Sequence, residues 1–269
     1  WSSGVCSSDL RSSLVAVVEL LEQPMPVEIQ PHDTVPQGFH DSVRFDAVSF
    51  QYISDGPWVI SDLNLNIVRG ARIGFVGSTG SGKSTLLDLL MGLLTPTEGE
   101  LLVDGDLLRG ARLRAWQQTI THVPQNIYLT DNTLAENIAF GVPYEAIDMN
   151  RVREAASQAQ MVDFIDRSPD GYQTVVGERG VRLSGGQRQR IGIARALYRE
   201  ANVLIFDEAT SALDNATEQS VMDAIDGLNR DLTVLTIAHR VTTVRMCDII
   251  VQLENGRIVA QGTYDQLIK

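Results

Sequence analysis

A glycine-rich segment at residues 77–84 sharply narrows the folds open to this chain. It reads Gly-Ser-Thr-Gly-Ser-Gly-Lys-Ser and lies between an apolar run, 72–76, and a stretch with helical spacing of apolar residues, 83–91. The spacing Gly-x-x-x-x-Gly-Lys-Ser between a strand and a helix is typical of loops that wrap around nucleotide phosphates. The segment therefore predicts an α/β fold in which a buried strand leads into this loop.

The residue types in this loop suit phosphate and Mg²⁺. Glycines let backbone N–H groups point at phosphate oxygens, and the following helix adds the positive end of its dipole. Lys83 is expected to meet the β- and γ-phosphates, and Ser84 to place its hydroxyl on Mg²⁺. The predicted nucleotide-binding residues here are Gly77, Ser78, Thr79, Gly80, Ser81, Gly82, Lys83, Ser84 and Thr85.

A second segment, 203–208, reads Val-Leu-Ile-Phe-Asp-Glu and brings two carboxylates to the end of an apolar strand. Ligands of open α/β sheets bind at that end of the strands. Asp207 is expected to hold Mg²⁺, directly or through water. Because successive side chains of a strand point in opposite directions, Glu208 can have a different role, as general base for an attacking water.

Composition and cysteine count argue against several other classes of protein. The chain has 269 residues and a formal net charge of −12, which disfavours a broad nucleic-acid-binding surface. Cys6 and Cys247 stand alone in the sequence, so neither a disulfide framework nor a zinc site is expected. The apolar stretch 14–21 contains Glu19 and is shorter than the roughly 20 residues needed to span a bilayer.

The chain is expected to contain a leader, a connector and one large domain. Residues 1–10 include Val-Cys-Ser-Ser-Asp-Leu, which resembles a translated sequencing adapter; they are expected to be an artefactual or disordered leader. A short amphipathic helix is predicted for 11–23, and a proline-rich connector for 24–40. The compact domain is expected to cover 41–269.

Within that domain, strands are expected to alternate with helices around a mainly parallel sheet. Strands are predicted at 43–52, 63–67, 72–76, 203–206 and 232–237, with a hairpin at 249–260 built on Asn-Gly. Helices are predicted at 83–91, 146–165 and 185–199. Residues 126–195 are expected to form an inserted helical lobe.

A third segment, 183–187, reads Leu-Ser-Gly-Gly-Gln, and here the chain resembles the ATP-binding cassette (ABC) superfamily. The resemblance implies a P-loop NTPase (RecA-like) core with a mainly parallel sheet, an N-terminal antiparallel β region and an inserted α-helical subdomain. It also implies that two cassettes pair head to tail; a homodimer is expected, and a heterodimer stays open. Each then contributes Ser184, Gly185, Gly186 and Gln187 to the ATP bound by the loop of the other.

Other positions match the family in its order along the chain, and the resemblance covers residues 43–269. Tyr52 resembles the aromatic residue that stacks on adenine, and Gln125 the glutamine that contacts Mg²⁺ and the attacking water. Asp214, in Ser-Ala-Leu-Asp, resembles the loop that joins two cassettes. His239 resembles the histidine at the γ-phosphate, so a cassette competent for ATP hydrolysis is expected.

Two features favour a bacterial exporter. The segment 176–180, Val-Gly-Glu-Arg-Gly, resembles an exporter loop that contacts the membrane domain, and the stretch before Asp41 resembles the end of a transmembrane helix with its linker. The partner implied is the transmembrane domain of an ABC exporter at the cytoplasmic face of the inner membrane. Residues 123–129 and 137–141 look most like exporters of lipids and lipid-linked sugars.

Two alternatives stay open at this point. One is an ABC ATPase without a transport role, such as a DNA-repair ATPase, which the acidic charge and the absence of a long coiled-coil insertion disfavour. The other is a regulatory cassette that binds ATP without turnover, which the presence of Glu208 and His239 disfavours.

Overall fold

The structure is a computed structural model that describes residues 14, 15, 18, 38–207, 213–227, 231–237 and 243–267. Of the predicted helix at 11–23, Leu14, Val15 and Val18 are described, and they are helical and exposed. The predicted leader and most of the connector lie outside the described residues. The compact unit that carries the fold is Pro36–Lys269, and the account below concerns its described part.

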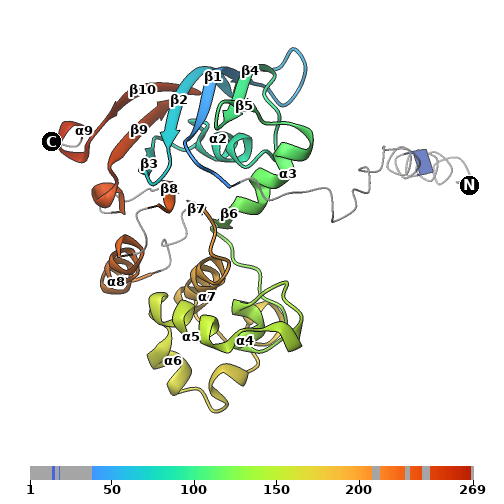
Figure 1. Ribbon diagram of the computed structural model, residues 1–269, viewed down its shortest axis with the longest axis vertical. Coiled ribbons are helices and arrows are strands. Elements are labelled where there is room, and N and C mark those ends of the chain that lie inside the picture. The colour runs from blue at the N-terminus through green and yellow to red at the C-terminus, as the bar shows by residue number, and fades with distance from the viewer. Residues whose placement is uncertain are drawn as a thin grey trace, which may run out of the picture. The chain divides into compact units, whose positions relative to one another are not determined.

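In the described part of this unit, the strands form two sheets (Figure 1). The antiparallel sheet has the order β2-β1-β4-β5, with β1 (Ser42–Phe50), β2 (Ile60–Val68), β4 (Glu98–Val103) and β5 (Asp106–Leu107). The second sheet has the order β10-β9-β3-β8-β7-β6. Its members are β3 (Arg72–Val76), β6 (Ile120–Val123), β7 (Val203–Asp207), β8 (Thr233–Ile237), β9 (Ile249–Glu254) and β10 (Arg257–Gly262). Neighbouring strands in it pair in parallel except β9 and β10.

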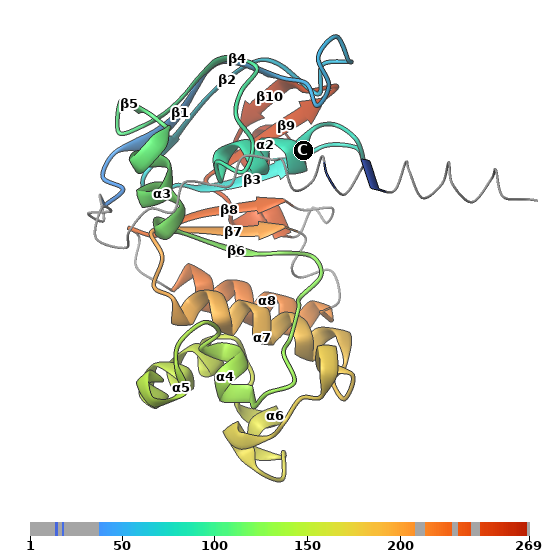
Figure 2. The same ribbon diagram turned by 90° about the vertical axis from the view of Figure 1, so that its right-hand side faces the viewer.

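Helices cover both faces of the parallel sheet (Figure 2). Helix α2 (Lys83–Leu90) packs on one face, and α7 (Gly185–Tyr198) and α8 (Asn215–Asp226) on the other. The lobe beyond α7 contains α4 (Leu134–Ile138), α5 (Met149–Gln158) and α6 (Val162–Asp166). The other helices in the described part of this unit are α3 (Gly110–Thr119), α9 (Tyr264–Leu267) and the 3-10 turns η2 (Tyr144–Ala146), η3 (Gly171–Gln173), η4 (Glu178–Gly180) and η5 (Thr243–Met246).

Alternation along the strands divides the core into two layers. In β7, Leu204 and Phe206 pack with α7 and α8, whereas Val203 and Ile205 pack with α2 and the antiparallel sheet. Both faces of the sheet are therefore buried, as expected for parallel strands. Asp207 follows Ile205 by two residues, so its side chain belongs to the α2 face.

Several predictions are confirmed and one helix is divided. The hairpin turns at Asn255 and Gly256, whose φ values of 47° and 74° are those of an Asn-Gly turn. The helix predicted for 146–165 is instead α5 and α6, because the chain turns at Gln160, which has a φ of 56°. Strands β4, β5 and β6 and helices α3, α8 and α9 were not predicted. The mainly parallel sheet, the antiparallel region and the helical lobe agree with the predicted fold.

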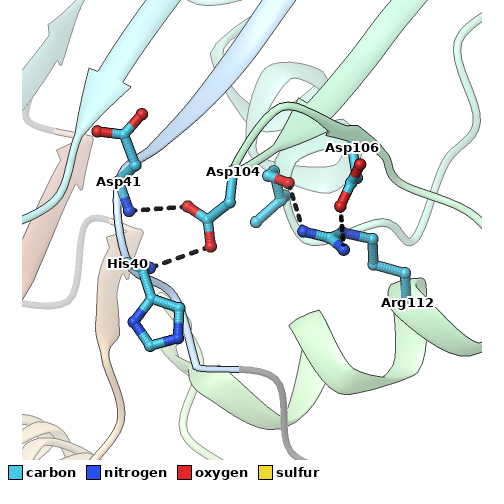
Figure 3. Close-up of polar contacts among 6 residues, drawn as sticks. His40, Asp41, Asp104, Asp106 and Arg112 are labelled. Atoms are coloured by element: carbon cyan, nitrogen blue, oxygen red, sulfur yellow. Dashed lines mark hydrogen bonds and ion pairs between the residues drawn. The ribbon is translucent and has the colours of Figure 1, made fainter.

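Residues just before β1 are fixed to the core (Figure 3). The Asp104 carboxylate accepts hydrogen bonds from the backbone N–H groups of His40 at 3.0 Å and Asp41 at 2.8 Å. It also accepts one from the N–H group of Ser42, the first residue of β1, at 3.2 Å. Phe39 is buried and lies edge-on to Trp116 of α3, with ring centroids 5.4 Å apart. Beside them, the guanidinium of Arg112, also on α3, bonds to the Val103 carbonyl and pairs with Asp106.

Candidate nucleotide site

The predicted site residues follow the carboxyl ends of parallel strands. The order β3-β8-β7-β6 brings four strand ends to the same edge of the sheet. The loop at 77–82 follows β3, Asp207 ends β7, and Gln125 comes two residues after β6. Strand β8, which lies between β3 and β7, ends at Ile237. Glu208 and His239 lie outside the described residues.

Lys83 fills the inside of the phosphate loop. Its side chain is 6% exposed, and its ammonium donates to the carbonyls of Gly77 at 2.7 Å and Ser78 at 2.9 Å. It also lies 3.4 Å from the Ser81 hydroxyl. Residues 78–80 are exposed, so the outer side of the loop is open to a ligand. The fold thus holds a buried positive charge directly behind an open turn.

Two glycines make this loop sterically possible. Gly77 has a φ of 152°, and a Cβ there would lie 2.3 Å from the Leu253 carbonyl oxygen. Gly82 has a φ of 102°, and a Cβ there would lie 2.8 Å from a methyl group of Ile60. Gly82 is also the N-cap of α2, where no side chain caps the helix. A negatively charged ligand can therefore approach the start of α2 without displacing a side-chain cap.

Tyr52, the predicted adenine-stacking residue, lies beside the loop. Its side chain is 60% exposed, and its hydroxyl is 3.1 Å from the Thr85 hydroxyl on α2. The ring stands edge-on to Phe50, with centroids 4.9 Å apart. An exposed aromatic ring is therefore available close to the phosphate loop.

The donor atoms predicted for Mg²⁺ fit that ion. Ser84 supplies a hydroxyl at the exposed start of α2, Gln125 a side-chain amide oxygen, and Asp207 a carboxylate. Among the described residues, no group of three or more His, Cys, Asp or Glu could form an all-protein metal site. Mg²⁺ suits a site with as few protein ligands as Ser84, Gln125 and Asp207 provide, because it keeps several waters and is usually held by one or two protein oxygens together with substrate phosphates.

The Leu-Ser-Gly-Gly-Gln segment starts α7 in the helical lobe. The Ser184 hydroxyl accepts from the Gln187 N–H at 3.2 Å, and the Ser184 N–H donates to the Gln187 side chain at 2.8 Å. This reciprocal pair is a capping box. Gly185 and Gly186 lie between the two partners, and both are partly exposed. The segment thus begins a helix that packs on α4 and α5. That helix belongs to one core layer, and α2 belongs to the other.

Asp214 caps α8. Its carboxylate accepts from the Thr217 N–H at 3.0 Å and from the Thr217 hydroxyl at 2.8 Å. These hydrogen bonds lower the pKa of Asp214 below its usual value. The side chain is exposed, so it remains accessible to a partner as well as to its own helix.

His122, a polar residue near the site, was not predicted. It lies in β6, where burial lowers the pKa of its imidazole while the charges of Asp207 and Asp88 oppose that shift. The sequence signal was a lone imidazole in the short strand Ile-Thr-His-Val. Residues 120–123 were not predicted to be a strand, so the sequence alone did not show which face His122 occupies.

Comparisons with known proteins agree with this geometry. A family model described as ABC transporter matches residues 60–211. The chain is 41% identical to an ATP-dependent lipid A-core flippase of Ralstonia nicotianae, over 90% of this chain and 41% of that protein. It is also 41% identical to the flippase of Chromohalobacter salexigens, over 97% of this chain and 45% of that protein.

Among solved structures, a bacterial Atm1-family ABC exporter with ATP bound matches with a TM-score of 0.84 and 36% identity. The match covers 96% of this chain and 45% of that one. This chain therefore spans less than half the length of these relatives. No helix among its described residues is long and apolar enough to cross a membrane. Since the family model covers more than half of the sequence, the chain belongs to the ABC transporter family and has the fold of its ATPase domain.

Proposed function

We propose that this chain binds and hydrolyses Mg²⁺-ATP and thereby powers export across a membrane, as the nucleotide-binding domain of an ABC exporter. The observation that carries the proposal is the buried ammonium of Lys83 behind an open glycine loop, at the same sheet edge as Asp207. That arrangement provides a positive charge for phosphates and a carboxylate for their metal ion.

Different groups of the chain would bind the phosphates, the adenine and Mg²⁺. Backbone N–H groups of the loop 77–83 and the start of α2 receive the phosphates, and Lys83 exchanges loop carbonyls for β- and γ-phosphate oxygens. Tyr52 stacks on the adenine. Ser84, Asp207 and Gln125 hold Mg²⁺, which when bound neutralises phosphate charge.

Hydrolysis is assigned to two residues outside the described part. Glu208 accepts a proton from water, the resulting hydroxide attacks the γ-phosphorus, and the bond to the ADP oxygen breaks to release inorganic phosphate. His239 contacts the γ-phosphate and helps to hold it. The support for these roles is topological: Glu208 directly follows β7, and His239 comes two residues after β8, the strand between β7 and β3.

A second copy of the chain completes the site in this proposal. The chain has two glycine-rich helix starts, and they belong to different core layers. Head-to-tail pairing brings Ser184, Gly185, Gly186 and Gln187 of one copy onto the ATP held by the other, with Asp214 at the joint. Binding energy at this interface is then available to drive a rearrangement of the membrane domain.

A surface beside β6 suits the membrane domain. Leu93, Tyr128 and Phe140 are exposed although large and apolar. Arg195 fixes two of them, because it donates to the Tyr128 carbonyl at 3.0 Å and its guanidinium lies 4.5 Å from the centre of the Phe140 ring. Next to Leu93 is a cavity of about 380 Å³ that Arg195 and His122 also line. Such a rigid apolar surface favours a protein partner.

The domain limits follow from the same assignment. Residues 41–269 form the nucleotide-binding domain, with the helical subdomain at about 126–195. Residues 11–40 are the end of the last transmembrane helix and its linker. The domain then lies at the cytoplasmic face of the inner membrane. Lipids or lipid-linked sugars are the proposed cargo, because the flippases named above share 41% of aligned residues with this chain.

Replacing Glu208 tests the proposal. Glu208→Gln removes the proton acceptor but keeps the shape of the side chain, so ATP binding is expected to persist while phosphate release stops. ATP should then hold the variant as a dimer in sedimentation experiments. Glu200→Gln, an exposed acid outside the site, is the matched control and should behave like the parent chain. Phosphate release by Glu208→Gln at the parental rate would remove Glu208 from the role of base.

A further inference from the structure

Strand register places His122 and Asp207 on the same face of the parallel sheet. His122 pairs with Ile205 across β6 and β7, so both project to the same side. Ile205 packs in the core layer of α2, and Asp207 is two residues farther along the same strand. His122 and Asp207 are therefore diagonal neighbours on neighbouring strands, under α2.

Helix α2 adds polar groups above this pair. Ser84 and Asp88 are four residues apart, so they lie on the same side of the helix, one turn apart. Burial lowers the pKa of His122, and the charges of Asp207 and Asp88 oppose that shift, so both carboxylates lie near the imidazole. The imidazole is thus electrostatically coupled to the strand carboxylate and to the helix carboxylate.

One ring nitrogen of His122 lacks a protein partner. Among the described residues, Nε2 is buried and makes no hydrogen bond. Buried polar atoms are nearly always paired, and an unpaired one calls for a specific explanation, such as a functional role. The ring also lines the 380 Å³ cavity beside Leu93, so only part of it is covered by the core.

We propose that His122 is a positioning residue for Mg²⁺: when nucleotide is bound, its Nε2 donates a hydrogen bond to the Asp207 carboxylate and fixes the orientation in which that carboxylate holds the ion. This inference rests on the proposed function. Carboxylates that bind metals are themselves hydrogen-bonded, and loss of such a partner commonly lowers metal affinity by about 10- to 100-fold.

Nucleotide binding at graded Mg²⁺ concentration tests this role without relying on turnover. The probe is a fluorescent ATP analogue, followed by anisotropy with the full chain, once with Mg²⁺ and once with EDTA. His122→Leu is expected to raise the Mg²⁺ concentration for half-maximal binding by about tenfold. Binding in EDTA should be unchanged, because the loop and Lys83 are intact. His122→Asn retains a donor and should recover most of the loss.

Thr121→Val is the matched control, because Thr121 pairs with Leu204 and faces the other core layer. Its Mg²⁺ dependence should equal that of the parent. If the parent binds Mg²⁺-ATP but His122→Leu has the same Mg²⁺ dependence, the positioning role is wrong while the proposed function stands. Equal losses with Mg²⁺ and with EDTA also overturn it, since they indicate general damage to the site. A parent chain that binds no nucleotide overturns both.

Discussion

The two glycine-rich helix starts, at α2 and α7, differ in whether a side chain caps the backbone N–H groups of the first turn. At α2 the N-cap is Gly82, which has no side chain, and the charge behind the loop is the ammonium of Lys83. At α7 the N-cap is Ser184, and its hydroxyl and N–H are both bonded to Gln187. The uncapped N–H groups at the start of α2 are therefore available to bind an anion. At the start of α7, the hydrogen bonds between Ser184 and Gln187 must break before these groups can bind an anion.

Removal of the charge behind the first loop should have the largest effect. Lys83→Ala deletes the ammonium that is expected to meet two phosphates, so Mg²⁺-ATP affinity should fall about 100-fold, given charge-assisted bonds of about 1.5–3 kcal/mol. Calorimetric titration measures this directly. Arg44→Ala, at an exposed cation on β1, should leave affinity unchanged. If Lys83→Ala binds Mg²⁺-ATP within a few-fold of the parent's affinity, the ammonium behind the first loop does not make the start of α2 a better anion site than the start of α7.

The backbone shape of the first loop gives the next largest effect. Gly82→Ala combines a φ of 102° with a Cβ 2.8 Å from the Ile60 methyl group and should lower the free energy of unfolding by about 1–3 kcal/mol. Gly80→Ala is the matched control: its φ is 80°, but a Cβ there meets nothing within 4 Å. Denaturant unfolding of both variants separates the cost of the positive φ, which both positions share, from the cost of the close contact with Ile60, which only Gly82 has. Equal losses would show that close packing around Gly82 contributes nothing.

Loss of the cap at the second helix start should cost less. Ser184→Ala is expected to lower the free energy of unfolding by about 1 kcal/mol and to weaken the ATP-induced dimer, with ATP binding by one chain unchanged. Thr133→Ala removes a similar capping box at α4 and serves as control. Its stability loss should match, but its dimer should be normal. Equal weakening of the dimer in both variants would assign the effect to stability, not to contact with ATP.

The smallest effect is expected at the third cap, Asp214. Hydrogen bonds from Thr217 lower its pKa, so the ionised carboxylate stabilises the fold above the ordinary Asp pKa of about 3.9, and this contribution is lost as pH falls through the lower folded value. The thermal midpoint of Asp214→Ala should lie below that of the parent at neutral pH, and the gap should shrink in acid. If the difference in thermal midpoint between the parent and Asp214→Ala does not change with pH, the ionised carboxylate does not stabilise the start of α8.

The sequence predicted the elements that carry strong local signals. Strand β3 and the Asn-Gly hairpin follow from apolar runs and turn residues, and the loop before Lys83 follows from its glycines. The capping box of Ser184 and Gln187 could also have been predicted, because Ser-x-x-Gln has that spacing.

Features that depend on long-range packing were not predicted. Helix α3 has few apolar residues, and it is held by Trp116, whose indole N–H donates to the Leu90 carbonyl at 2.7 Å. The turn at Gln160 depends on Met161, which is buried in the helical lobe. His122 could be placed only from the register of β6 on β7. Contacts between distant segments leave no periodic pattern in the sequence.

Fixation of residues 38–42 has a mechanical consequence. Three consecutive N–H groups share the Asp104 carboxylate, and Phe39 is buried against Trp116. Tension on the chain ahead of Gly38 would load these contacts together before it could peel β1 from its neighbours. Force applied there would thus reach β4 and α3 directly.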